Sequence, residues 1–338
     1  MSLMPTREQH IDMAAGIMIT WMILGHVASH ASYNGAFFNI GVYLSFFMPW
    51  FFYKAGLFYQ NRHDSIKECI NRGWKKLLKP FVIFSLIGQV FYYICLILEH
   101  NVSFRSFVYQ PLRCLFVTEC LPGNGALWFL IVLFMINTFA PYIIDKLHPI
   151  VIVIVGIGIA FLCYLLHISW FPCIIPNFFA GIAFFALGYW LKDKEYKGIV
   201  FATAVLVYAL CCIIGYPSIY FHHNTASDSF IYLLYFPASI AGIVILNNLC
   251  RWISPFLKFS RFRWIGQNAM NLYVTYWIIL VLLRLVALDV CQLQNTTLIF
   301  WLYVSTMLIT LPLLNMLINH IKSKQSKSLF ICPNSSLS

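Results

Sequence analysis

Long apolar stretches separated by short loops constrain this chain more than any other feature of its sequence. A helix needs about 20 apolar residues to cross a bilayer, and about ten stretches approach that length. The chain of 338 residues is 61% hydrophobic and 10% charged, whereas a soluble domain carries about 25% charged residues. We therefore predict an all-α, polytopic membrane bundle of about ten transmembrane helices, at residues 11–30, 38–59, 79–98, 126–145, 149–167, 173–191, 198–215, 229–249, 269–288 and 297–319.

Basic residues are distributed unevenly over the predicted loops. The alternate loops hold only Arg105 and Arg113. Because cytoplasmic loops are enriched in Lys and Arg, this asymmetry predicts that both termini are cytoplasmic. It also explains the net charge of +11 without a nucleic-acid partner. The loops on the side of the termini hold the other basic residues, namely Arg7, Arg62, Lys67, Arg72, Lys75, Lys76, Lys79, Lys146, Lys192, Lys194, Lys197, Arg251, Lys258, Arg261, Arg263, Lys322, Lys324 and Lys327.

The remaining organisation is simple, with no internal repeat, linker or soluble domain in the sequence. Residues 1–321 are expected to form a single transmembrane domain, and the Ser- and Lys-rich residues 322–338 a disordered cytoplasmic tail. The first apolar run is long enough to span and has no small-residue cleavage site after it, so we expect no cleaved signal peptide. The longest external segment, about 99–125, is expected to form a re-entrant or interfacial lid.

Most of the 11 cysteines lie inside apolar runs, where a free cysteine acts as a small packing residue. Cys114, Cys120 and Cys173 fall on the predicted external side, and the sequence leaves open whether they form disulfides.

His26, near the outer end of the first predicted span, is the first candidate for chemistry. A proton-exchanging side chain at membrane depth is costly unless it has a partner or a function. The alternative is a buried neutral histidine that donates one hydrogen bond to a neighbouring helix. His30 lies one turn further on the same face, and such a pair could bind a metal. No third ligand of suitable spacing is visible, so no metal site is predicted.

Two cations lie inside predicted spans. Lys54, near the inner end of the second span, either extends to the cytoplasmic headgroups or holds an anionic ligand. Arg284, near the outer end of the ninth span, is expected to extend to the interface.

Five segments, in order along residues 11–276, resemble motifs of the membrane-integral acyltransferase 3 family. These proteins are polytopic O-acyltransferases that modify surface and extracellular polysaccharides. The segments are Ile11-Asp-Met-Ala-Ala-Gly16 through Gly25-His26, Met48-Pro-Trp-Phe-Phe-Tyr-Lys-Ala-Gly56, Arg72-Gly-Trp-Lys-Lys-Leu-Leu-Lys-Pro80, Ala126-Leu-Trp-Phe-Leu130 and Ile265-Gly-Gln-Asn-Ala-Met-Asn-Leu-Tyr273.

The resemblance implies transfer of an acyl group, most readily acetyl, from cytoplasmic acyl-CoA to a hydroxyl of a surface glycan or a lipid-linked saccharide. His26 is then the general base, assisted by Lys54. The CoA phosphates are expected at Arg72, Lys75, Lys76 and Lys79, although the positive-inside rule alone would also place cations there. No cofactor is expected beyond this donor substrate. The location implied is a bacterial-type inner (plasma) membrane, with lipids as further partners. The acceptor path is expected to be lined by His30, Asn124, Trp128, Asn268 and Tyr273.

Three positions depart from the family pattern. Ala15 stands where Arg or Lys is usual, Ala55 replaces a serine, and Tyr276 replaces a frequent histidine. Positions 15 and 26 lie roughly 16 Å apart along a helix, so the usual pair frames a path across the membrane. We hypothesise that Lys54 supplies the missing charge.

Two other functions remain open at this level. The first is a transporter or flippase of glycans or polar lipids, which should show internal repeats or broken helices in matching halves. The second is a catalytically weak family member, as the loss of the cation at Ala15 would suggest.

Overall fold

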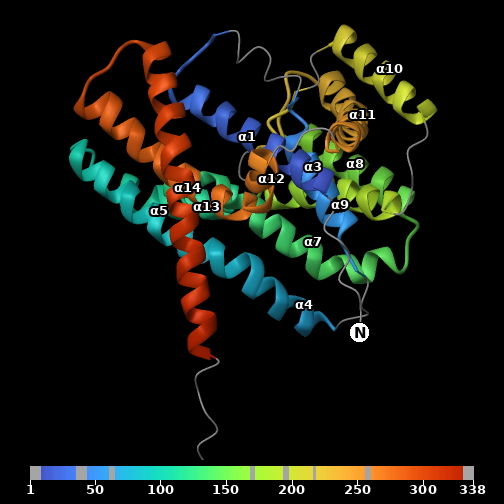
Figure 1. Cartoon of the computed structure of the whole chain (residues 1–338), viewed down its shortest axis with the longest axis horizontal. Helices are drawn as coiled ribbons and strands as arrows, with labels where there is room; N and C mark the ends of the chain where they lie inside the picture. Colours follow the sequence, from blue (N-terminus) through green and yellow to red (C-terminus); the bar gives the residue numbers. More distant parts are fainter. Residues whose placement is uncertain are drawn as a thin grey trace, which may run out of the picture.

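The structure is a computed structural model that describes residues 9–35, 44–60, 65–167, 172–192, 198–215, 218–255 and 260–329. In these ranges every regular element is a helix, and the one β-bridge joins Tyr220 and Thr225 in a loop. Figure 1 shows the helices gathered in one bundle. This confirms the predicted all-helical class.

The first half of the bundle begins with α1 (Gln9–His30) and α3 (Phe47–Leu57). α4 (Ile66–Gly73) continues through the π-helix η2 (Trp74–Leu78) into α5 (Lys79–Leu98). The chain then forms η3 (Arg105–Tyr109), α6 (Gln110–Thr118) and the 3₁₀-helix η4 (Pro122–Leu127), which leads directly into α7 (Trp128–Ile144).

The second half contains α8 (Pro149–Leu165), α9 (Ile174–Leu191), α10 (Gly198–Ile214) and α11 (Ser229–Ile253). The short α12 (Ser260–Gln267) precedes α13 (Ala269–Arg284), which continues as the π-helix η5 (Leu285–Val290). The last element, α14 (Thr296–Leu329), reaches into the segment predicted as a tail. Residues 330–338 of that segment lie outside the described residues.

Seven helical segments of the described chain are long and apolar enough to cross a membrane. α8 and α10 are shorter apolar helices of 17 residues each, and α3 has 11 residues, after a segment (36–43) outside the described part. Large apolar side chains such as Leu86, Ile154 and Leu308 point outward, as expected for helices whose surroundings are lipid. The chain is therefore a multi-pass membrane protein, while the count of ten and the orientation stay predictions.

Close helix contacts explain two glycines of the family-like motifs. A Cβ on Gly56 of α3 would overlap the Phe185 carbonyl of α9, and a Cβ on Gly188 of α9 would overlap the Tyr53 carbonyl of α3. Gly266 of α12 likewise meets the backbone of α1 at Asp12. Small residues let helix backbones approach closely in membranes, where dispersion contacts replace the hydrophobic effect as the main attraction.

An amide ladder joins α13 to α14. The Asn271 amide nitrogen donates to the side-chain oxygens of Asn315 and Asn319, at 2.8 and 3.1 Å. The ladder ties α14 to the bundle along part of its length, and the C-terminal part of α14 projects beyond the other helices (Figure 1).

Candidate active site

The end of the segment 99–125, which was predicted to form a re-entrant or interfacial lid, enters the bundle. Gly123, Asn124, Ala126 and Leu127 of η4 are buried. A Cβ on Gly88 of α5 would lie 2.6 Å from the Gly123 carbonyl oxygen, so the two backbones touch. Asn124 is fully buried and donates to the Val274 carbonyl of α13 at 3.1 Å. η4 is therefore fixed between α5 and α13.

Two motifs that are far apart in sequence meet at this point. The Tyr273 hydroxyl of α13 donates to the Ala126 carbonyl of η4. The Tyr273 ring also contacts the Phe129 ring of α7, with centroids 5.9 Å apart. The late motif that ends at Tyr273 therefore anchors the start of the motif at 126–130.

His26 lies against the same stretch of α13. Its ring centroid is 5.7 Å from that of Tyr276 and 5.1 Å from that of Trp277. His30 also packs edge-on against the Trp277 ring, with ring centroids 5.0 Å apart. Tyr276, which departs from the family pattern, thus contacts the candidate base directly. Arg284, at the end of α13, interacts electrostatically with His30.

Several buried polar atoms around His26 have no hydrogen-bond partner among the residues that the structure describes. They are His30 Nδ1, Asn124 Oδ1, the Tyr276 hydroxyl and Trp277 Nε1. Leaving such a group unsatisfied costs about 1–3 kcal/mol. The cluster around His26 therefore presents donors and acceptors for a polar ligand or water.

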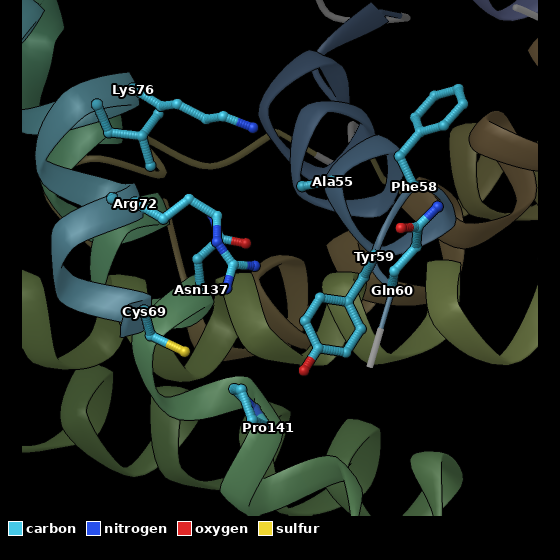
Figure 2. A pocket seen from close by; sticks show the side chains of 11 residues that line it. Ala55, Phe58, Tyr59, Gln60, Cys69, Arg72, Lys76, Asn137 and Pro141 are labelled. Carbon is cyan, nitrogen blue, oxygen red and sulfur yellow. The ribbon is translucent and has the colours of Figure 1, made fainter. Parts of the chain in front are cut away.

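A separate cavity of about 300 Å³ lies between α3, α4 and α7. Figure 2 shows the Arg72 and Lys76 side chains directed from one wall toward the end of α3 on the other. The predicted partners Lys75 and Lys79 do not line it. The full lining consists of Ala55, Phe58, Tyr59, Gln60, Cys69, Arg72, Gly73, Lys76, Leu77, Asn137 and Pro141.

Lys54 of α3 is next to the cavity lining in sequence. It precedes the cavity residue Ala55, and its Nζ is 5.7 Å from the centre of the Trp50 ring. The Trp50 indole donates to Asn247 of α11 at 3.0 Å. Ala15 itself is fully buried in α1, where a cation is usual in the family.

α3 and α7 connect the cavity to the His26 cluster. Phe52 of α3 packs against Phe129 of α7 with centroids 4.8 Å apart. Asn137 lines the cavity, while Trp128 lies nine residues earlier on α7, roughly 14 Å along the helix axis. We call the end of the bundle near the cavity the basic end, and the end near His26 and His30 the histidine end.

Two predicted lining residues have other surroundings. Asn268 precedes α13, where its amide donates to the Trp264 carbonyl at 2.8 Å and its oxygen accepts from Asn319 of α14. Trp128 stacks in parallel on His222, at 4.7 Å between centroids. His222 lies outside the family-like motifs. Its only signal in the sequence is a pair of adjacent histidines, His222 and His223, in a loop predicted to be external.

Metal and disulfide chemistry find little support in the described residues. No group of three or more His, Cys, Asp or Glu side chains in the described ranges could hold a metal ion. Cys114, Cys120 and Cys173 are free thiols.

In a comparison with sequence models of protein families, the family described as "Acyltransferase domain" matches residues 9–315 of the chain. No curated protein and no solved structure gives a significant match. The matched range holds all five motifs, the basic cavity and the His26 cluster.

Proposed function

This chain belongs to the acyltransferase 3 family, and on that premise we propose that it is a membrane-bound O-acyltransferase. The proposed reaction moves an acyl group, most readily acetyl, from cytoplasmic acyl-CoA to a hydroxyl of a cell-surface or lipid-linked glycan, at a bacterial-type inner membrane. One observation carries the proposal. Motif residues from α1, η4, α7 and α13 gather at one point, around a histidine with unsatisfied polar atoms beside it.

The proposed base is His26. Neutral imidazole accepts the proton of the acceptor hydroxyl while the oxygen attacks the thioester carbonyl. The C–S bond then breaks, and the CoA thiolate leaves with the proton that His26 returns. The Tyr276 hydroxyl and Trp277 Nε1 are donors without partners among the described residues, so they are suited to bind the oxyanion that forms in this step.

The proposed donor site is the basic cavity. Its volume of about 300 Å³ is at the lower end of the range for small-molecule sites. The Arg72 guanidinium and the Lys76 ammonium suit the CoA phosphates, and the aromatic rings of Phe58 and Tyr59 line the same space. The pantetheine arm would follow α3 past Lys54 toward His26. In this proposal Lys75 and Lys79 add only to the general positive potential.

An acyl-transfer assay tests the base and the relocated charge together. Purified protein is given radiolabelled acetyl-CoA and envelope glycan from cells that lack the protein. Removing a general base typically costs 10² to 10⁴ in rate, so His26→Gln should lower kcat by at least about a hundredfold. Lys54→Met should lower kcat/KM, and Lys54→Arg should restore much of it. His148→Gln, at the start of α8, is the control. Unchanged transfer by His26→Gln would reject the base, and unchanged transfer by Lys54→Met would reject the relocated charge.

The basic cavity offers a test with a neighbouring control. Lys76→Ala should raise the KM for acetyl-CoA by about tenfold, because one charge-assisted hydrogen bond contributes about 1.5–3 kcal/mol. Lys75→Ala removes the same charge one residue away, outside the cavity lining, and should change that KM much less. Equal effects of the two substitutions would mean that the cluster acts only through its overall potential.

A further inference from the structure

His222 occupies an unusual position for a loop residue. It belongs to residues 218–228, the loop before α11, yet its ring stacks on Trp128 at 4.7 Å with an interplanar angle of 4°. Trp128 is itself buried and belongs to the motif at 126–130. From Trp128 a series of ring contacts through Phe129, Tyr273 and Tyr276 leads to His26. The loop therefore brings a second histidine to the His26 cluster.

The hydrogen bond of His222 defines which ring nitrogen carries the proton. Nε2 lies 2.9 Å from the Thr118 carbonyl oxygen at the end of α6. A carbonyl can only accept, so Nε2–H donates. In the neutral ring Nδ1 is then an acceptor with a free lone pair. Within the described part of the chain, the hydrogen bond recorded for the His222 side chain is the one at Nε2, which leaves Nδ1 for a ligand.

The loop is built to hold this ring in place. Asn177 of α9 donates to the His222 carbonyl at 2.9 Å. Tyr220 and Thr225 form two backbone hydrogen bonds, which close the loop around His222. Asn224 donates to the Ala160 carbonyl of α8 and accepts from Tyr232 of α11 at 2.6 Å. Hydrogen bonds to α6, α8, α9 and α11 therefore hold the loop that carries His222.

Thr118, the acceptor of the His222 bond, is fixed as well. The next residue, Glu119, has φ of 55° and is buried. Its Oε1 accepts from the Ile174 backbone nitrogen at the start of α9, at 2.7 Å. A left-handed conformation at a non-glycine residue costs free energy and persists only where the surroundings impose it. The direction of the Thr118 carbonyl, and with it the tautomer of His222, is thereby determined.

We propose that His222 is an acceptor-binding residue, whose Nδ1 receives a hydrogen bond from a hydroxyl adjacent to the one that is acylated. The inference rests on the proposed acyltransferase function and narrows its acceptor class to saccharides with neighbouring free hydroxyls. His26 and His222 then bind two hydroxyls of one sugar ring, and the acceptor is held in a single orientation before transfer. Loss of the His222 Nδ1 acceptor should weaken binding of the saccharide and leave binding of acyl-CoA unchanged.

Two isosteric substitutions separate this role from a structural one. His222→Gln places an amide nitrogen where Nε2 was, so it keeps the bond to Thr118 and removes the acceptor at the Nδ1 position. His222→Asn places an oxygen where Nδ1 was and loses the bond to Thr118. His223→Gln, an exposed neighbour in the same loop, controls for disturbance of the loop.

The experiment measures saccharide binding to full-length protein in lipid nanodiscs, without acyl-CoA. The probes are methyl pyranosides of glucose, galactose, mannose and rhamnose, followed by the monodeoxy analogues of each sugar that binds. Wild-type protein should lose about tenfold in affinity for one deoxy analogue, the loss expected for one unmatched buried hydrogen bond. His222→Gln should bind the parent sugar about tenfold more weakly and no longer distinguish it from that analogue, while His222→Asn keeps part of the distinction.

Several results would overturn the proposal. They are a His222→Gln protein that binds and discriminates like the wild type, an equal loss in His223→Gln, and a wild type that binds none of the four sugars. Acetyl transfer is measured separately. Binding that depends on His222 without any acetyl transfer would reject the proposed function, whereas transfer that is unaffected in His222→Gln would reject only the role of His222.

Discussion

At the scale of single residues, His222 has a consequence for stability as well as for binding. Burial lowers the pKa of His222 from its usual 6.5 to about 3, with smaller contributions from the neighbouring His223 and His26 and against the opposing effect of the Thr118 hydrogen bond. Between pH 6.5 and about 3 the unfolded chain therefore binds a proton at position 222 that the folded chain does not bind.

This difference predicts that the protein loses stability as the pH falls below 6.5. One such proton changes the free energy of unfolding by up to about 1.4 kcal/mol per pH unit. His222→Gln removes the titratable imidazole. The thermal unfolding midpoint of this variant in detergent should therefore fall less than that of the wild type between pH 7.5 and 5.0. His100→Gln, an exposed histidine after α5, serves as the comparison. A wild-type midpoint with the same pH dependence as that of His222→Gln would show that His222 is protonated equally in both states.

At the scale of helices, the close contact of α3 with α9 positions both Lys54 and the wall of the basic cavity. Gly56 and Gly188 each face backbone atoms of the other helix, with no flexible side chain that could move aside. Gly56→Leu or Gly188→Leu should therefore push the helices apart and destabilise the protein by about 3 kcal/mol or more, at the upper end of overpacking costs. The measurement is the thermal midpoint, with the KM for acetyl-CoA rising as the cavity widens.

Gly158 of α8 is the matched control, because a Cβ there meets no atom within 4 Å. Gly158→Leu places the same side chain on an apolar helix at a position without a helix contact and should leave the midpoint nearly unchanged. A similar fall in the thermal midpoint of all three variants would mean that leucine destabilises these helices wherever it is placed, and not through the contact of α3 with α9.

Most of the helices could be predicted from the sequence, because runs of apolar residues reveal membrane helices by composition alone. The predicted spans at 79–98 and 198–215, for example, correspond to α5 and α10. The burial of η4 could not be derived in this way, because its depth depends on the contact of Gly88 with Gly123 and on the bond from Asn124 to α13. Pro122, Gly123 and Gly125 indicated only that the segment was irregular.

The candidate site was predictable to the extent that it lies on motifs. His26 could be selected because a titratable side chain at membrane depth is costly without a function, Tyr273 because the family resemblance marks it, and Arg72 and Lys76 because they belong to a basic cluster. The sequence does not distinguish Lys76 from Lys75. Only the structure shows that Lys76 lines the cavity and that Lys75 does not. His222 lies outside the motifs, and its place beside Trp128 depends on long-range contacts of its loop with α6, α8 and α9.

At the scale of the whole molecule, the two sites lie toward opposite ends of α7, and the proposed reaction needs them on opposite sides of the membrane. Acyl-CoA is cytoplasmic, so the basic end must face the cytoplasm. The glycan must reach His26 and His222 from the other side. The unequal charge of the loops predicts the same orientation. The donor and the acceptor would thus enter from different compartments and meet inside the bundle.

Labelling of cysteines in intact cells tests this orientation. Cys291, between α13 and α14, is an exposed native thiol on the predicted outer side, so a membrane-impermeant maleimide should label it, and Cys291→Ser should remove that label. In the Cys291→Ser background, Ser227→Cys places a thiol at an exposed position of the His222 loop, and Lys67→Cys places one on exposed α4. Ser227→Cys should react in intact cells, whereas Lys67→Cys should react only after permeabilisation. The reverse pattern would place the basic cavity outside, where it could not receive cytoplasmic acyl-CoA, and labelling of both positions from one side would exclude a path that crosses the membrane.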